Sequence, residues 1–157
     1  MLDTGHRIIP SELEIVPYMA AHLMAMSEQD TEKYWGDAVR TPGYAKALEK
    51  AGPAHTAMRD GKVLACVGLM HQWDGRATAW AVMTKNVGGA DYLAIHRAVK
   101  RFMKLINYRR IDATVLCTFE NAIRWAEMLG FKRETPEPMQ NYGPDGRGHY
   151  LYAWVAP

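Results

Sequence analysis

The chain has 157 residues, of which 48% are hydrophobic and 23% are charged, and its formal net charge is +2. These values match ordinary globular proteins, so they exclude a disordered chain and favour a single domain over residues 1–157. A net charge this close to zero argues against a polyanionic partner, so nucleic acid is an unlikely ligand.

Neither a secretory signal nor a membrane span is predicted. The N-terminus has no basic segment followed by an apolar run, and no stretch approaches about 18 consecutive apolar residues. Cys66 and Cys117 both lie in apolar runs, which favours core residues in a reducing compartment, although a bridge between them stays open. We therefore expect a soluble, cytoplasmic protein.

The first third of the chain is expected to be mainly helical. Arg7–Ile9 suits a short strand, and Ser11 then suits a helix cap because acidic residues follow it in the first turn. This helix is expected to reach about Met26. Further helical pieces are expected over residues 30–40 and 44–50.

The middle of the chain predicts an antiparallel meander. Asp60-Gly61 and Asp74-Gly75 separate three apolar runs, which cover residues 55–58, 63–70 and 77–83. An Asp-Gly pair between two apolar runs is the strongest short-range hairpin signal.

The remaining residues alternate helices and strands. A loop over 86–91 precedes a long helix over 92–108, whose apolar residues recur at helical spacing. A strand over 111–117 and a helix over 120–129 follow, and Gly130 suits the C-cap of that helix.

The tail predicts a final hairpin of residues 139–142 and 149–155 around Asp145-Gly146. A meander joined to a strand–helix–strand unit predicts an α/β fold, in which helices cover a mixed sheet.

One segment carries a family resemblance. Residues 120–131 read ENAIRWAEMLGF, and Ala-Ile-Arg followed by Leu-Gly-Phe at this spacing resembles the GNAT family of acyl-CoA N-acyltransferases. The resemblance covers roughly residues 54–155 and implies a mostly antiparallel central sheet flanked by helices. The Ala-Ile-Arg-Trp sequence and the polar tail at 142–146 are also similar to GNAT-like proteins of bacteriophages, some of which are virion components.

The resemblance implies acetyl-CoA as co-substrate, bound in a cleft between the fourth and fifth strands. Backbone N–H groups of the fourth strand, near Val82, Met83 and Thr84, would polarise the acyl carbonyl. Amides of the loop after that strand would bind the pyrophosphate at a helix N-terminus. The loop residues are Val87, Gly88, Gly89 and Ala90.

The loop and the later helix both depart from the family pattern. Val87 stands where the family has an arginine, and Tyr92 stands where it has a small residue. Asp91 would place a negative charge near the phosphates, or would simply cap the following helix. Ala126 replaces the tyrosine that acts as general acid, and Phe119 replaces an asparagine.

Acyl transfer to an amine needs a base or a water path to one, and the strand over 77–83 has no carboxylate. The candidates are His71 beyond the third strand, Glu120 at a helix start, and Tyr142 or Tyr150 in the final hairpin. Each is explained more simply as a structural residue. No metal-ligand spacing is present.

A basic cluster over residues 97–110 suits the 3′-phosphate of CoA, a weak nucleic-acid surface or a solvated helix face. Two functions are therefore carried forward. One is acyl transfer from acetyl-CoA to an amine of a small molecule or protein. The alternative is a catalytically degenerate, GNAT-like phage protein that binds a protein partner in a virion or host.

Overall fold

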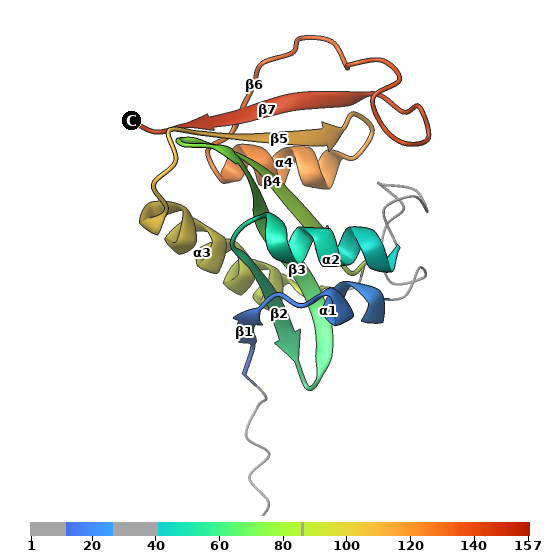
Figure 1. Cartoon of the computed structure of the whole chain (residues 1–157), viewed down its shortest axis with the longest axis vertical. Coiled ribbons are helices and arrows are strands. Elements are labelled where there is room, and N and C mark those ends of the chain that lie inside the picture. Colours follow the sequence, from blue (N-terminus) through green and yellow to red (C-terminus); the bar gives the residue numbers. More distant parts are fainter. Residues whose placement is uncertain (1–11, 27–40, 86) are drawn as a thin grey trace, which may run out of the picture.

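A single mixed sheet organises the chain (Figure 1). The computed structural model describes residues 12–26, 41–85 and 87–157. Within these ranges the sheet has seven strands in the order β1-β2-β3-β4-β5-β7-β6. Neighbouring strands are antiparallel except for β4 and β5, which are parallel, so the predicted α/β class and mostly antiparallel sheet are confirmed.

The elements have the following bounds. The strands are β1 (Glu14–Pro17), β2 (Ala54–Arg59), β3 (Lys62–Trp73), β4 (Arg76–Met83), β5 (Arg110–Leu116), β6 (Lys132–Arg133) and β7 (His149–Val155). The helices are α1 (Ala20–Ala25), α2 (Pro42–Ala51), α3 (Gly89–Leu105) and α4 (Glu120–Met128).

The meander of β2, β3 and β4 forms as predicted, with one Asp-Gly pair at each turn. Asp60 and Gly61 have φ angles of 53° and 74°, and Gly75 has a φ of 89°. Glycine adopts this left-handed region without steric cost, and aspartate tolerates it better than most residues. The turn chemistry therefore fixes both hairpins.

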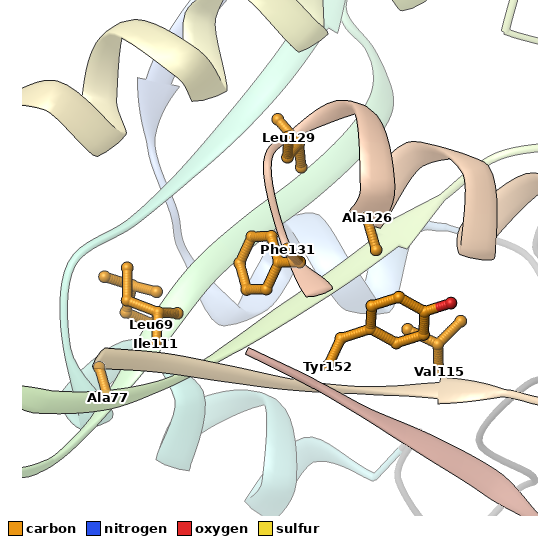
Figure 2. Close-up of a cluster of buried hydrophobic side chains, with 8 residues drawn as sticks. All are labelled: Leu69, Ala77, Ile111, Val115, Ala126, Leu129, Phe131 and Tyr152. Carbon is orange, nitrogen blue, oxygen red and sulfur yellow. The ribbon is translucent and has the colours of Figure 1, made fainter. Parts of the chain in front are cut away.

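The helices cover the two faces of the sheet in pairs (Figure 1). Helices α1 and α2 pack on a core around Tyr18, Cys66 and Trp80. Helices α3 and α4 pack on the opposite face, where Ile95 and Ala126 lie against the strands. Figure 2 shows the second core, in which side chains of α4, the turn after it and β3, β4, β5 and β7 converge.

The N-terminal prediction was wrong in one respect. Glu14–Pro17, expected to be helical, form β1, and α1 begins only at Ala20. Ile15 pairs with Ala57 of β2, and this pairing supplies backbone hydrogen bonds that the first turn of a helix would lack. Tertiary contact therefore overrides the helix-start pattern of the local sequence. The strand predicted at Arg7–Ile9, the cap at Ser11 and the helix predicted over 30–40 lie outside the described residues.

The later elements agree more closely. Helix α2 covers the predicted 44–50, and Gly130, with a φ of 96°, follows α4 as expected. The predicted final hairpin is reduced to a single bridge between Met139 and His149. Strand β7 pairs along its length with β5 and, at two residues, with β6, which was not predicted.

Two further predictions concern thiols and membranes. Cys66 and Cys117 are both free thiols, and Cys66 is buried in the core under α1 and α2. Burial raises the pKa of the Cys66 thiol to about 11. In the described part of the chain, no helix is both long and apolar enough to span a membrane.

Candidate functional site

Strands β4 and β5 form a wedge. They pair over only three residues each, Arg76–Thr78 with Arg110–Asp112. Beyond that point β4 continues along β3 as far as Met83, and β5 continues along β7 as far as Leu116. The two parallel strands therefore separate towards their C-terminal ends, which is where open α/β sheets place ligands.

A charged cluster holds the closed end of the wedge. Asp112 is 4% exposed and accepts hydrogen bonds from Arg76 Nε at 2.9 Å and Nη2 at 2.5 Å. Its other oxygen accepts from Arg110 Nε at 2.6 Å, and Arg110 also pairs with Glu134 at 2.8 Å. These pairs join β4, β5 and the segment after β6, so they fix where the strands begin to diverge.

The open end of the wedge continues into a cavity of about 800 Å³. Side chains of β3, β4 and β5 form its floor, and α3 and α4 form its walls. On α3 the lining residues run from Tyr92 to Leu105, and along β4 and the two residues after it they run from Ala79 to Lys85. The cavity is within the size range of small-molecule and cofactor sites.

The free edge of β4 presents backbone donors to this cavity. Thr84 N donates to Leu64 O of the β3 side at 2.9 Å. Successive residues of a strand direct their backbone groups to alternate sides, so Val82 also faces β3, whereas Ala81 and Met83 face the separated β5 side. The wedge therefore leaves strand-type hydrogen-bonding groups of β4 facing the cavity.

The mouth of the cavity lies at the start of α3. Gly88 is the N-cap and its oxygen accepts from Tyr92 N at 2.9 Å. The amides of Gly89 and Ala90 are therefore among the first-turn N–H groups that have no intrahelical acceptor. A Cβ added at Gly88 or Gly89 would have nothing within 4 Å, so this end of the helix is sterically open.

Asp91 does not cap α3, contrary to one prediction. It lies in the first turn and makes a bidentate ion pair with Arg59 of β2, whose Nη2 and Nε lie 2.6 and 3.1 Å from its Oδ1. The pair raises the pKa of the Arg59 guanidinium, so the arginine stays charged. Arg59 thus neutralises the carboxylate that was expected to repel an anion at this helix start.

The predicted cofactor-binding residues fall into three groups. Met83, Thr84 and Val87 line the cavity. Gly88, Gly89 and Ala90 are exposed at its mouth. Val82 neither lines the cavity nor lies at its mouth. It pairs with Cys66, and its side chain packs on the opposite face of the sheet, in the core beneath α1 and α2.

The three predicted catalytic residues are not brought together, and none lines the cavity. His71 lies at the closed end of the wedge, where its Nδ1 is 2.8 Å from Tyr108 Oη. The Glu120 side chain is 82% exposed and pairs with Arg124 on its own helix. Tyr142 is half exposed, and Tyr150 lies under the Arg133 guanidinium at 3.8 Å.

Two imidazoles line the cavity, and the sequence reasoning missed both: His55, which is exposed on β2, and His149. His149 is 2% exposed, and the ring of Tyr142 packs on it at 5.4 Å. Its Nδ1 lies 3.0 Å from Arg147 O, and a carbonyl only accepts, so Nδ1 carries the proton. In the neutral ring the lone pair is therefore on Nε2. Only the register of β7 with β5 places this residue, and no local motif shows it.

Polar contacts also join the two helices over the cavity. Trp125 Nε1 of α4 donates to His96 Nδ1 of α3 at 3.2 Å. Burial lowers the pKa of His96, and Lys100 and Arg97 lower it further. Phe119 and Ala126, which stand where the sequence resemblance implied an asparagine and a tyrosine, both line the cavity. In the described residues no group of three His, Cys, Asp or Glu side chains could hold a metal ion.

The comparisons with known proteins rest on structure alone. No family model and no curated protein matches the sequence. An acetyltransferase of the GNAT family from Bacillus anthracis matches with a TM-score of 0.65 at 19% identity, over 92% of this chain and 96% of that one. An N-acetyltransferase from Staphylococcus aureus matches with a TM-score of 0.71 at 9% identity, over 92% and 97%.

A third structure, from Salmonella typhimurium, was solved with acetyl-CoA as its cofactor. It matches with a TM-score of 0.68 at 13% identity, over 91% of this chain and 93% of that one. The matches extend over nearly the whole of each chain, so the predicted architecture is confirmed. The chain has the fold of the GNAT acetyltransferases.

Proposed function

We propose that the protein is an acyl-CoA-dependent N-acyltransferase that uses acetyl-CoA as co-substrate. The wedge carries this proposal: β4 and β5 pair over three residues and then separate around a cavity lined by both strands. A similar structure binds acetyl-CoA, which supports the same ligand here.

The cleft fits the parts of such a ligand. The pantetheine arm contains amide groups, one of which would pair with the unpaired edge of β4 at Met83, near the mouth of the cavity. The pyrophosphate would accept hydrogen bonds from the exposed first-turn amides of Gly89 and Ala90. Because Arg59 neutralises Asp91, the helix start keeps its preference for an anion.

The reaction would place an amine beside the thioester carbon. The amine nitrogen forms a bond to that carbon as the carbon–sulfur bond breaks. The amine gives up one proton to a base, and the sulfur leaves as a thiolate that is then protonated to the thiol of CoA. A deeper strand amide, such as that of Ala81, would stabilise the oxyanion. We assign the base to His149, since its Nε2 carries the lone pair and its Nδ1 is held by Arg147 O. In this assignment Tyr142 is a positioning residue.

The acceptor is proposed only as an amine of a small molecule or a protein. A spermidine N-acetyltransferase is among the similar structures, which favours testing polyamines first. The similar structures named above come from bacteria, and the likeness to phage proteins stays a prediction. The non-catalytic alternative predicts no affinity for CoA.

Calorimetric titration with acetyl-CoA tests the proposal. Gly88 has a φ of −67° and open space around it, so Gly88→Glu should fold normally and repel the pyrophosphate. We expect binding by the native chain and at least tenfold weaker binding by this variant. Gly88→Gln, which adds the same bulk without charge, should retain most of the affinity.

Gly43→Glu adds the same charge near the start of α2, where a Cβ also meets nothing within 4 Å, and should bind normally. Absence of binding by the native chain at millimolar acetyl-CoA would refute the proposal and favour the protein-binding alternative.

His149 is tested separately by the rate of acyl transfer to a polyamine. His149→Gln should lower kcat, while the affinity for acetyl-CoA stays unchanged. A variant with the native kcat would show that the base is another group.

A further inference from the structure

A hydrogen bond between side chains connects the two helices that wall the cavity. Trp125 Nε1 of α4 donates to His96 Nδ1 of α3 at 3.2 Å, across 29 residues of the sequence. Trp125 also packs on both hydrophobic cores of this face, around Ile111 and around Ile95. Trp125 lines the cavity, whereas His96 is 9% exposed and lies outside the lining. An effect of His96 on a ligand must therefore pass through Trp125.

Tyr92 extends this contact towards the mouth of the cavity. It lies one turn before His96 on α3, so the two side chains share a face of the helix. Its ring lies 6.0 Å from the ring of Trp125, and it also lines the cavity. Tyr92 N donates to Gly88 O and so closes the first turn of α3, where the pyrophosphate of the proposed ligand would bind. The contact between His96 and Trp125 thus supports a wall beside the proposed ligand.

The hydrogen bond fixes the protonation state of His96. An indole N–H only donates, so the Nδ1 atom that faces it has a free lone pair and the ring proton is on Nε2. A protonated imidazole has a donor at both nitrogens. Protonation would therefore set two N–H groups against each other, and the indole of Trp125 would have to leave its present position.

The residues of α3 around His96 favour the neutral ring. Burial lowers the pKa of His96, and the cations of Lys100 and Arg97 on the same helix lower it further. Burial also raises the pKa of Tyr92, so this phenol stays uncharged at neutral pH. The neutral, accepting form of His96 is therefore the form present at pH 7.

The carboxylates of α4 have other partners. Glu120 pairs with Arg124 at the exposed start of the helix. Glu127 accepts a hydrogen bond from Tyr152 Oη of β7 at 3.0 Å. The side chain that α4 presents to His96 is therefore the Trp125 indole, which a protonated ring would repel.

We propose that His96 is a positioning residue for acyl-CoA, because only its neutral ring holds Trp125 in the wall of the cavity. This inference rests on the proposed function and assigns His96 to donor binding rather than to the chemical step. The sign follows from linkage: the ligand binds the form with the neutral ring, so its affinity is constant at high pH and falls as the ring gains a proton. An ordinary imidazole titrates near pH 6.5, so the fall should lie below about that pH.

Calorimetric titration with acetyl-CoA at about pH 7.5 and about pH 5.5 tests the proposal. Phosphate groups also titrate in this range, so the measured quantity is the difference between the native chain and His96→Gln. The amide oxygen of the glutamine can still accept from Trp125, and it does not titrate. The two proteins should bind almost equally at the higher pH. At the lower pH the native affinity should fall about three- to tenfold more than that of the variant.

Two further variants complete the design. His71→Gln is the matched control, because it removes an imidazole that contacts Tyr108 Oη outside the cavity, and it should keep the native pH dependence. His96→Leu cannot accept from the indole and should bind acetyl-CoA several-fold more weakly at both pH values. In this variant the KM for acetyl-CoA should rise while kcat at saturating acetyl-CoA stays native, since His96 does not touch the reacting groups.

A second measurement follows the contact without any ligand. The indole N–H signal of Trp125 in a proton–nitrogen NMR spectrum is assigned by its loss in Trp125→Phe. This signal should shift between the two pH values in the native chain and stay in place in His96→Gln. The indole signal of Trp154, which lies beside Gly130, should stay in place in both proteins.

The outcomes separate the two proposals. If acetyl-CoA binds with the same pH dependence in the native chain and in His96→Gln, the role of His96 is wrong and the proposed function stands. A Trp125 signal that does not move with pH would overturn that role as well. If the native chain binds no acetyl-CoA at either pH, the proposed function fails and the role of His96 fails with it. Should His96→Leu not fold, the comparison with His96→Gln and the Trp125 signal decide.

Discussion

The two ends of the β4–β5 wedge use opposite chemistry. At the closed end Arg76 and Arg110 surround the buried carboxylate of Asp112, and the strands are paired. At the open end Ala79 and Ala81 line an apolar cavity, and the β4 backbone faces that cavity. The charged end fixes the geometry, and the apolar end leaves the room that a ligand needs.

The difference also separates stability from binding. Removing the partners of a buried carboxylate, or replacing the carboxylate so that its partners are left unpaired, strongly destabilises the fold. Added bulk beside open space costs little folding free energy, although it removes room for a ligand. Substitutions at the two ends should therefore affect different measurements.

The largest effect is expected from Asp112→Asn. The amide cannot satisfy both arginines, and each arginine is about one-third exposed, so water compensates part of the loss. We expect the free energy of unfolding to fall by about 2 to 3 kcal/mol, below the 3 to 5 kcal/mol of a fully buried pair. Urea denaturation measures this, and Glu120→Gln, at an exposed ion pair, is the control. An equally small change in both variants would contradict a structural role for the cluster.

The second effect compares two alanines on the same strand and the same face. Ala77 is fully buried at the closed end, so Ala77→Leu should overpack the core and cost about 1 to 3 kcal/mol. A leucine in place of Ala81 would point into the cavity, so Ala81→Leu should change the free energy of unfolding by less than about 1 kcal/mol. The same substitution should weaken acetyl-CoA binding at least tenfold, because it fills space that the ligand needs. Thermal unfolding and calorimetry on both variants test the comparison, which would fail if Ala81→Leu proved the less stable one.

The smallest effect concerns pH. The pKa of His96 is lowered in the folded chain, mainly by burial, so below about pH 6.5 the unfolded chain binds a proton that the folded chain does not. Stability should therefore fall as the pH drops from 7 towards 5. His96→Gln keeps an acceptor for Trp125 and should weaken this dependence. An unchanged slope of unfolding free energy against pH would assign the acid sensitivity to other groups.

The sequence predicted most of the architecture because its signals were local. Asp-Gly turns fixed both hairpins of the meander, and the spacing of Ile95, Val99 and Phe102 fixed the inner face of α3. The predicted start of α3 was three residues too late. Asp91 suits an N-cap, but Gly88 is the N-cap and the helix already begins at Gly89.

The site was predicted less well because it depends on pairing between distant strands. His149 enters the cavity only through its register with Leu116, and Arg59 reaches Asp91 across 32 residues. Val82 was assigned to the cleft by its position near the end of β4, but strand alternation turns its backbone towards β3. The position of β4 in the sequence was predicted correctly. The side to which the backbone of each of its residues points depends on the pairing register with β3, which the sequence alone did not show.

The unpaired edge of β4 has a consequence for self-association. Exposed strand edges are templates on which other chains add as extra strands, and proteins normally blunt them with charge, proline or a covering element. Here the edge lies in the middle of the sheet, and α3, α4 and β5 surround it. The molecule can therefore keep a strand ready to pair with a narrow, flexible ligand while excluding the broader backbone of a neighbouring protein.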